Sequence, residues 1–265
     1  MTHLPAPDQF AARPGRISLI GAGPGAADLL TLRALRRLQE AEAVFYDRLI
    51  DPEVLALIPP GAERVNVGKE VGRCKWPQAR IDAAIVMAAL RGLRVVRLKS
   101  GDPSVFGRAA EEIATARAHG IEVEVIPGVT AASAAAASTL RPLTERGRFD
   151  RFLMLTATSL EGALPDQIAR SVAPGTRVAI YMGVHLAGAL AVQLIEAGVP
   201  ASSPVMLCER VGTAQERAVE ARLDGLAEAI AAHAIQNPAV IFVDVEPVAA
   251  PVAAGKPAQM AKVSL

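Results

Sequence analysis

The chain contains few aromatic residues and almost no excess charge. Phe, Trp and Tyr make up 3% of its 265 residues, and the formal net charge is +1 at pH 7. Nucleic-acid-binding proteins usually carry a basic surface, and those that bind single strands add aromatic side chains for base stacking. We therefore expect no nucleic-acid partner, and no RNA- or DNA-binding module is recognisable in the sequence.

Cysteine is also scarce. Cys74 and Cys208 are the two cysteines, and the four histidines show no metal-ligand spacing. A disulfide framework needs several cysteines, and structural zinc sites need closely spaced Cys or His pairs. The sequence thus predicts no metal site and two free thiols, which are typical of the reducing cytoplasm where we expect the protein to reside.

Long hydrophobic runs are absent as well. The alanine-rich stretch 131–138 is too short and too weakly hydrophobic to cross a bilayer, so we expect no membrane partner. Residues 1–14 contain three prolines and lack the apolar core of a secretory signal. We expect 1–14 to be a disordered leader and 249–265, rich in Ala, Pro and Lys, to be a flexible tail.

Between residues 16 and 126, short apolar runs alternate with segments of helical periodicity. Strands are expected over five of these runs: 16–20, 43–46, 64–67, 94–98 and 122–126. Helices are expected between them, over 28–38, 51–58, 77–90 and 111–119. The alternation indicates a parallel sheet covered by helices on both faces.

The first of these helices is expected to bury a row of leucines. Leucine recurs at every third position, at Leu29, Leu32, Leu35 and Leu38. Asp28 precedes the row and is the expected N-cap, because its side chain can accept a hydrogen bond from a free backbone N–H of the first turn.

The pattern changes over residues 127–150, which combine Pro127-Gly128, an alanine run and a charged segment. A second set of strands is expected after it: 152–156, 177–181, 204–208, 217–221 and 239–244. Helices are expected near 163–172, 186–197 and 222–233. We therefore predict an α/β fold with two α/β domains, covering 15–140 and 141–248.

The most informative motif is the loop Gly21-Ala22-Gly23-Pro24-Gly25, which joins the first expected strand to the first helix. Glycines allow the backbone to approach a nucleotide-bearing cofactor, and the helix N-terminus offers free N–H groups. The loop also fits the dinucleotide fingerprint, with Asp47 as its acidic residue. Pro24 weighs against that interpretation because it removes an N–H donor. An NAD-dependent oxidoreductase stays an alternative.

Glycines or charged residues follow all five strands of the first set. After the first loop these segments are 46–49, 67–69, 97–108 and 127–133. Ligands of open parallel sheets bind beyond the carboxyl ends of the strands. The five segments are therefore predicted to border one cleft.

These segments resemble the corresponding motifs of the tetrapyrrole methylases. The resemblance extends to Leu30-Thr31-Leu32, Arg141-Pro142-Leu143-Thr144 and Tyr181-Met182-Gly183, and it covers roughly residues 16–246. Each motif is weak alone, but their order and spacing together are specific. The resemblance implies two α/β domains with an interdomain cleft, S-adenosyl-L-methionine as methyl donor, S-adenosyl-L-homocysteine as product, and a homodimer. It further implies C-methylation of uroporphyrinogen III at ring positions 2 and 7 to give precorrin-2, which feeds siroheme, cobalamin or heme d1 synthesis.

The resemblance also implies roles for individual positions. The family's acid/base pair falls on Asp47 and Lys69. A substrate with eight carboxylates needs cations, and Arg73, Lys75 and Arg146 are the candidates. The cofactor contacts of the family fall on Pro24, Ser100, Gly101, Asp102, Val105, Thr130, Ala131, Met182 and either Val211 or Gly212.

The chain departs from the family pattern at several positions. The family usually has histidine where this chain has Glu145 and Thr158, and glycine where it has Ala157 and Asp244. The departures leave two further alternatives beside the oxidoreductase: a methylase of a later precorrin, and a tetrapyrrole-binding or regulatory protein without turnover.

Overall fold

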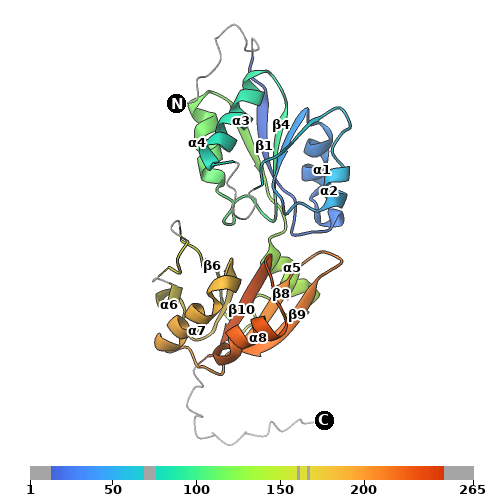
Figure 1. Ribbon diagram of the computed structural model, residues 1–265. Coiled ribbons are helices and arrows are strands. Elements are labelled where there is room, and N and C mark those ends of the chain that lie inside the picture. The colour runs from blue at the N-terminus through green and yellow to red at the C-terminus, as the bar shows by residue number, and fades with distance from the viewer. Residues whose placement is uncertain (1–12, 69–75, 160–161, 166–167, 248–265) are drawn as a thin grey trace, which may run out of the picture.

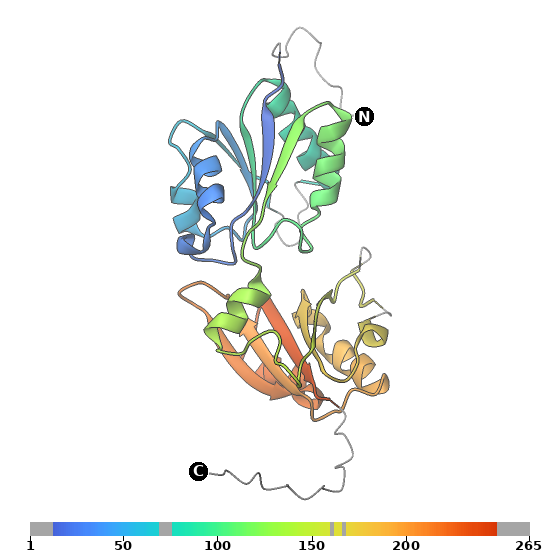
Figure 2. The same cartoon turned by 180° about the vertical axis from the view of Figure 1, so that it is seen from behind.

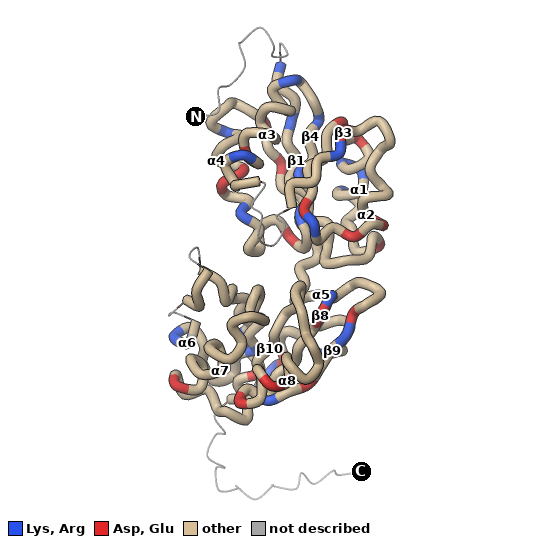
Figure 3. Tube along the Cα trace, viewed as in Figure 1, with Lys and Arg blue, Asp and Glu red and all other residues tan. Residues whose placement is uncertain are grey.

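The computed structural model describes residues 13–68, 76–159, 162–165 and 168–247. They form two α/β units, each built on its own five-stranded sheet. In Figure 1 the first domain lies above the second, and the chain passes from one to the other after β5 (Glu122–Ile126). Acidic and basic residues are mixed over both domains (Figure 3), as the near-zero net charge requires.

The first sheet is entirely parallel, as the alternating pattern predicted. Its strand order is β3-β2-β4-β1-β5. The strands are β1 (Arg16–Gly21), β2 (Ala43–Tyr46), β3 (Glu63–Asn66), β4 (Val95–Lys99) and β5. Apolar residues of one sheet face pack with α1 (Leu32–Gln39) and α2 (Pro52–Ala56). Those of the other face pack with α3 (Gln78–Leu90) and α4 (Ala109–Ala118). The predicted coverage of both faces is confirmed.

The start of the first helix differs from the prediction. Asp28 lies in a separate 3-10 turn, η2 (Ala27–Leu29), and α1 is capped by Thr31, whose Oγ1 accepts a hydrogen bond from Ala34 N at 3.1 Å. The leucine row is not one buried face, because Leu38 is fully buried whereas Leu32 is 73% exposed. A spacing of three falls about 60° short of a full helical turn at each step, so such a row winds around the helix.

The second sheet is mixed, with the order β6-β7-β10-β8-β9. Its strands are β6 (Arg151–Thr156), β7 (Thr176–Tyr181), β8 (Pro204–Glu209), β9 (Arg217–Arg222) and β10 (Ala239–Val245). β6 and β7 are parallel, whereas β10 runs antiparallel to β7 and β8. One face of the sheet packs with η3 (Val184–Leu186), α7 (Ala187–Glu196), η4 (Leu223–Gly225) and α8 (Leu226–Ala232). The helix expected over 163–172 is confined, within the described residues, to α6 (Ile168–Ser171).

The alanine run forms a helix that the sequence analysis missed, α5 (Ala131–Ser138). Ala132 and Ala135 are fully buried and belong to one apolar cluster with Ala179 and Met206 of the second sheet. Figure 2 shows α5 lying on that sheet rather than on the first. The chain thus leaves the first sheet at 127–130, about ten residues before the predicted boundary at 140. The small alanine side chains of α5 let this helix pack closely on the second sheet.

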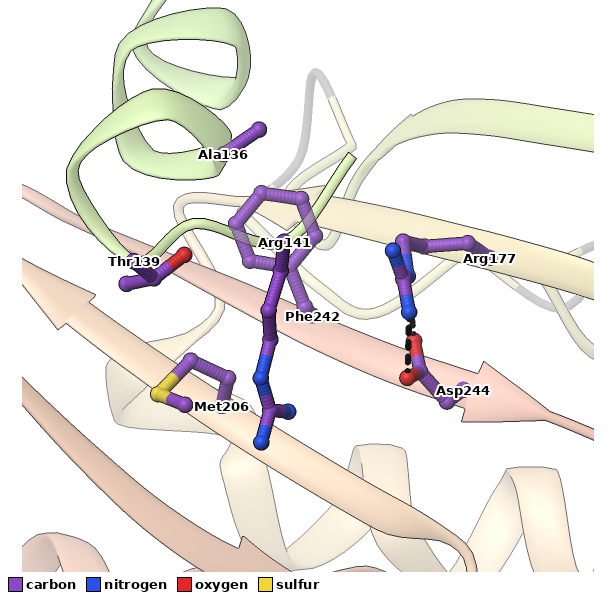
Figure 4. A pocket seen from close by; sticks show the side chains of 7 residues that line it. All are labelled: Ala136, Thr139, Arg141, Arg177, Met206, Phe242 and Asp244. Atoms are coloured by element: carbon purple, nitrogen blue, oxygen red, sulfur yellow. Dashed lines mark hydrogen bonds and ion pairs between the residues drawn. The ribbon is translucent and has the colours of Figure 1, made fainter. Parts of the chain in front are cut away.

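A buried ion pair links two neighbouring strands of the second sheet. Arg177 of β7 and Asp244 of β10 are cross-strand neighbours, with Nε–Oδ1 and Nη2–Oδ2 distances of 2.6 and 2.7 Å. The same guanidinium donates to the carbonyl of Pro142 and lies 4.5 Å from the ring centre of Phe149. The pair lines a small cavity of about 10 Å³ together with Arg141 and Met206, whose side chains are drawn in Figure 4. Arg177 thus fixes both ends of segment 142–149 to the sheet.

We expect Asp244→Ala to lower the free energy of unfolding by about 3–5 kcal/mol, because it leaves the Arg177 guanidinium buried without its carboxylate. Urea denaturation followed by circular dichroism measures the loss. Asp224→Ala is the matched control, since Asp224 pairs with Arg222 at the surface, and its effect should be much smaller because exposed ion pairs contribute little to stability. Equal losses of unfolding free energy in the two variants would show that burial of the Arg177–Asp244 pair makes no difference to its contribution.

Candidate functional site

Three strand ends of the first sheet meet at glycines. A Cβ on Gly21, at the end of β1, would lie 2.5 Å from Gly128 N and 2.7 Å from Gly101 O. Gly101 follows β4 with φ +69°, a conformation that disfavours other residues. Gly101 N also donates to Gly23 O at 2.7 Å, and Gly23 N donates back to Gly101 O at 3.2 Å. The predicted convergence of these loops is therefore real, and it requires residues without side chains.

Asp102 joins two of the loops. Its Oδ1 accepts hydrogen bonds from the backbone N of Ser104 at 2.7 Å and from the Ser104 hydroxyl. Its Oδ2 accepts from Gly128 N at 3.0 Å. One carboxylate thus holds the turn after β4 against the loop after β5, by the local side-chain bonding that favours Asp in turns.

The second domain closes the site from the other side. Ala26 N donates to Gly212 O at 2.6 Å, and a Cβ on Gly25 would lie 2.5 Å from the carbonyl carbon of Gly212. The Tyr181 hydroxyl lies 2.7 Å from Thr130 Oγ1 and accepts from Ala132 N at 3.0 Å. The glycine loop and the N-terminus of α5 are thereby fastened to the ends of β8 and β7.

A cavity of about 370 Å³ lies between these elements. Its volume is typical of small-molecule sites. Nine of the ten positions named as cofactor contacts line it: Pro24, Ser100, Gly101, Asp102, Val105, Thr130, Ala131, Met182 and Val211. Gly212 is not among the lining residues but forms the adjoining contact with the glycine loop.

Other lining residues were not singled out from the sequence. Phe106 and Tyr181 come from opposite domains, and their ring centres are 5.2 Å apart. Both residues lie inside motifs that carry the family resemblance, but neither was predicted from the sequence to belong to the site. Cys208 and the stretch 237–240 also line the cavity and carried no sequence signal. Burial raises the pKa of the Cys208 thiol to about 12, so this wall is uncharged at neutral pH.

Beside the cavity lies a cluster of four ionic side chains. Asp47 follows β2, and its Oδ1 accepts from Arg97 Nη2 at 2.7 Å. Arg97 Nε donates to Glu112 Oε1 at 3.0 Å, and Lys99 Nζ lies 2.9 Å from Glu112 Oε2. Burial lowers the pKa of Lys99, and the neighbouring charge of Arg97 lowers it further. Arg48 and Leu49, which follow Asp47 directly, line the cavity.

The acid/base candidate Lys69 and the substrate-contact candidates Arg73 and Lys75 lie outside the described residues. Arg146 is not brought to the cavity: it lies in the turn closed by the Glu145–Phe149 bridge, just before Arg151. Arg151 pairs with the first residue of β7, whereas the last residue of that strand, Tyr181, lines the cavity. The charged segment that the sequence analysis assigned to the interdomain region thus reaches the far end of the second sheet.

In the described part of the chain, no group of three or more His, Cys, Asp and Glu side chains is arranged to hold a metal ion. Among the same residues, no helix has the length and apolar character needed to cross a membrane.

Comparison with known proteins shows which family this chain resembles. The family described as Tetrapyrrole (Corrin/Porphyrin) Methylases matches residues 16–227. A uroporphyrinogen-III C-methyltransferase of Paracoccus denitrificans is 43% identical over 230 residues, which are 86% of this chain and 80% of the relative. A siroheme synthase of Chromobacterium violaceum is 43% identical over 88% of this chain. The chain spans about half, 50%, of that relative's length.

Solved structures agree in fold. A uroporphyrin-III C-methyltransferase of Thermus thermophilus, complexed with S-adenosylhomocysteine, is 40% identical and superimposes with a TM-score of 0.74 over 86% of this chain and 92% of the other. A cobalt precorrin-4 methyltransferase gives a TM-score of 0.76 at 24% identity, over 91% and 97% of the two chains. This second likeness concerns the fold alone.

We expect Gly21→Ala to lower the free energy of unfolding by about 1–3 kcal/mol, because the new methyl group would overlap backbone atoms of two other loops. Thermal and urea denaturation measure this loss. Gly61→Ala is the control, since a Cβ there meets nothing within 4 Å, and its effect should stay within about 0.5 kcal/mol. Equal stability of Gly21→Ala and the unsubstituted protein would show that the loops separate without penalty.

Proposed function

The chain belongs to the tetrapyrrole methylases, and we propose that it is an S-adenosylmethionine-dependent C-methyltransferase. The proposed reaction is methylation of uroporphyrinogen III at ring positions 2 and 7 to give precorrin-2. The cavity carries the proposal, because residues from five separate segments, named beforehand as donor contacts, line one space. The likeness to a methyltransferase complexed with S-adenosylhomocysteine supports the choice of donor.

The residues of the cavity suit the donor. Backbone at Gly101 and Ala131 would approach it closely, while Pro24, Val105 and Val211 would exclude water around it. When bound, S-adenosylmethionine supplies an electrophilic methyl group that passes to an electron-rich pyrrole carbon while the sulfur keeps the electron pair of the broken bond. Since charge disperses in this reaction, a dry cavity with fixed backbone dipoles favours it, and no metal is needed.

The macrocycle must lose a proton after it is methylated, and Asp47 is the proposed acceptor. Its carboxylate is one-third exposed, at 32%, next to the cavity-lining Arg48. Lys69 stays the proposed proton donor, and it lies outside the described residues. Arg73 and Lys75 stay proposed contacts for substrate carboxylates. Arg146 stays a proposed substrate contact only if the substrate, or a partner subunit that binds it, reaches the far end of the second sheet.

A methylase of a later precorrin is the second candidate. Thr158, where the family usually has histidine, donates from its hydroxyl to the carbonyl of Met182 at 3.2 Å. Met182 lines the cavity with φ 57°, in the left-handed region. Because Thr158 contacts Met182, its presence in place of the usual histidine would affect which macrocycle the site accepts.

The homodimer and the cytoplasmic location are further proposals. The first rests on the family resemblance and the second on the two cysteines. Light scattering coupled to size-exclusion chromatography should give a mass twice that of one chain.

Incubation with S-adenosylmethionine and uroporphyrinogen III should give a product with two added methyl groups by mass spectrometry. Calorimetry should detect binding of S-adenosylhomocysteine and none of NADH. Binding of NADH without S-adenosylhomocysteine would favour the oxidoreductase. Donor binding without methylated product would favour a binding protein or a methylase of another macrocycle.

We expect Asp47→Ala to lower kcat by about 10²–10⁴-fold, since a positioned general base contributes that much. The affinity for S-adenosylhomocysteine should change by less than about threefold, because a pure loss of chemistry leaves binding intact. Asp51→Ala controls for local loosening: Asp51 is a nearby carboxylate that caps α2. Parallel loss of kcat and affinity in Asp47→Ala would assign Asp47 a structural role.

A further inference from the structure

Glu112 of α4 is a wholly buried carboxylate that the proposed reaction does not use. Its side chain is 0% exposed. Oε1 accepts from Arg97 Nε and from Lys99 Nζ, both at 3.0 Å, and Gln78 Nε2 lies 3.4 Å away. Buried ion pairs are often no more stabilising than apolar residues of similar volume. Stability alone is therefore a weak reason for this cluster.

The cluster leads from the interior to the edge of the cavity. The side chains of Glu112, Arg97 and Lys99 are 0%, 3% and 6% exposed, whereas that of Asp47 is 32% exposed. Asp47 is thus the exposed member of the four, and it directly precedes Arg48, which lines the cavity. Every charge in the cluster has an opposite partner, so the four side chains together are neutral.

Arg97 is held so firmly that it fixes the Asp47 carboxylate. Its Nε binds Glu112, and its Nη1 donates to the carbonyl of Leu98 at 3.0 Å and to that of Phe45 at 3.4 Å. The remaining nitrogen, Nη2, donates to Asp47 Oδ1 at 2.7 Å. A guanidinium is planar and rigid, so bonds on two nitrogens set the direction of the third.

Lys99 links Glu112 to the cavity wall in a similar way. It is the last residue of β4, and Ser100 and Gly101 follow it into the cavity. Its Cε lies 3.2 Å from the position of a Cβ on Gly107, so its stem packs beneath the turn 100–108. Glu112 therefore holds both the turn that faces the donor and the arginine that orients Asp47.

We infer that Glu112 is a positioning residue for Asp47, acting through Arg97. The inference rests on the proposed function, in which Asp47 accepts the proton released by the methylated macrocycle. Glu112 touches no part of the cavity itself. Its effect is to keep the carboxylate at one place and in one orientation.

Glu112→Gln tests this with little change in volume. Loss of comparable supporting side chains lowers activity by about 10–100-fold, and we expect a fall of that size in kcat. The affinity for S-adenosylhomocysteine, measured by calorimetry, should change by less than about threefold. A fall in affinity as large as the fall in kcat would assign Glu112 to general integrity of the site and overturn the inference.

The decisive measurement is a double-mutant cycle with Asp47→Asn. If Glu112 acts through Asp47, adding Glu112→Gln to Asp47→Asn should lower kcat by less than about threefold more, because the group it positions is already lost. A purely structural role would multiply the two effects, and that result would overturn the inference. Unchanged kcat in the single variant would overturn it as well.

Glu124→Gln is the matched control. Glu124 lies in β5 of the same sheet and also pairs with an arginine, Arg37, at 2.7 Å, but it is outside the cavity lining. Its kcat should stay within about twofold of the unsubstituted protein. Equal loss in this variant would show that any broken ion pair of the domain has the same effect.

Arg97→Lys covers the case in which Glu112→Gln does not fold, as judged by circular dichroism. It keeps the charge facing Glu112 but lacks the fork that also reaches Asp47, and it should show the same non-additivity with Asp47→Asn. Loss of fold in both variants would make the cluster structural and overturn the inference. Absence of product from the unsubstituted protein would instead refute the proposed function, and this inference with it, before any variant is compared.

Discussion

The contact of three backbones at Gly21, Gly101 and Gly128 is the constraint on which the site depends. Parallel strands end side by side, but side chains would normally keep their loops apart. Without Cβ atoms the loops approach to van der Waals distance, and Gly101 exchanges hydrogen bonds with Gly23. The turn carrying Ser100 and Asp102 then faces Pro24 across the cavity. A Cβ on Gly21 or Gly128 would overlap backbone atoms of the neighbouring loops, whereas Gly101 is constrained by its φ of +69°.

The arginine and lysine side chains buried in the described parts of the two domains are paired with carboxylates. Arg97 and Lys99 face Asp47 and Glu112, and in the other domain Arg177 faces Asp244. An unpaired buried charge would bear a large desolvation penalty. The cavity lining itself is mainly backbone and uncharged side chain, with Arg48 and Asp102 as its charged members. Such a lining can exclude water around a cationic donor while the ionic cluster stays at its margin.

Much of the fold could be predicted because its signals are local. Apolar runs gave the strands, and their alternation with helices gave the parallel order of the first sheet. The residues that line the cavity lie largely in motifs at strand ends, which the topology brings together. Other features depend on distant partners: Arg97 meets Asp47 across 50 residues of sequence. The position of Arg146 outside the cavity lining was likewise not predictable, because it depends on the direction in which β6 runs.

Three of the departures from the family pattern lie in two different parts of the second domain. Asp244 pairs with Arg177, and Glu145 pairs with Arg148, which also binds Glu246. Both departures lie at the far end of the second sheet, where they form ion pairs within this chain. Thr158 is different, because its hydroxyl bonds to the backbone of Met182 at the cavity. The first two changes thus lie away from the cavity lining, whereas Thr158 contacts one of the residues that form it.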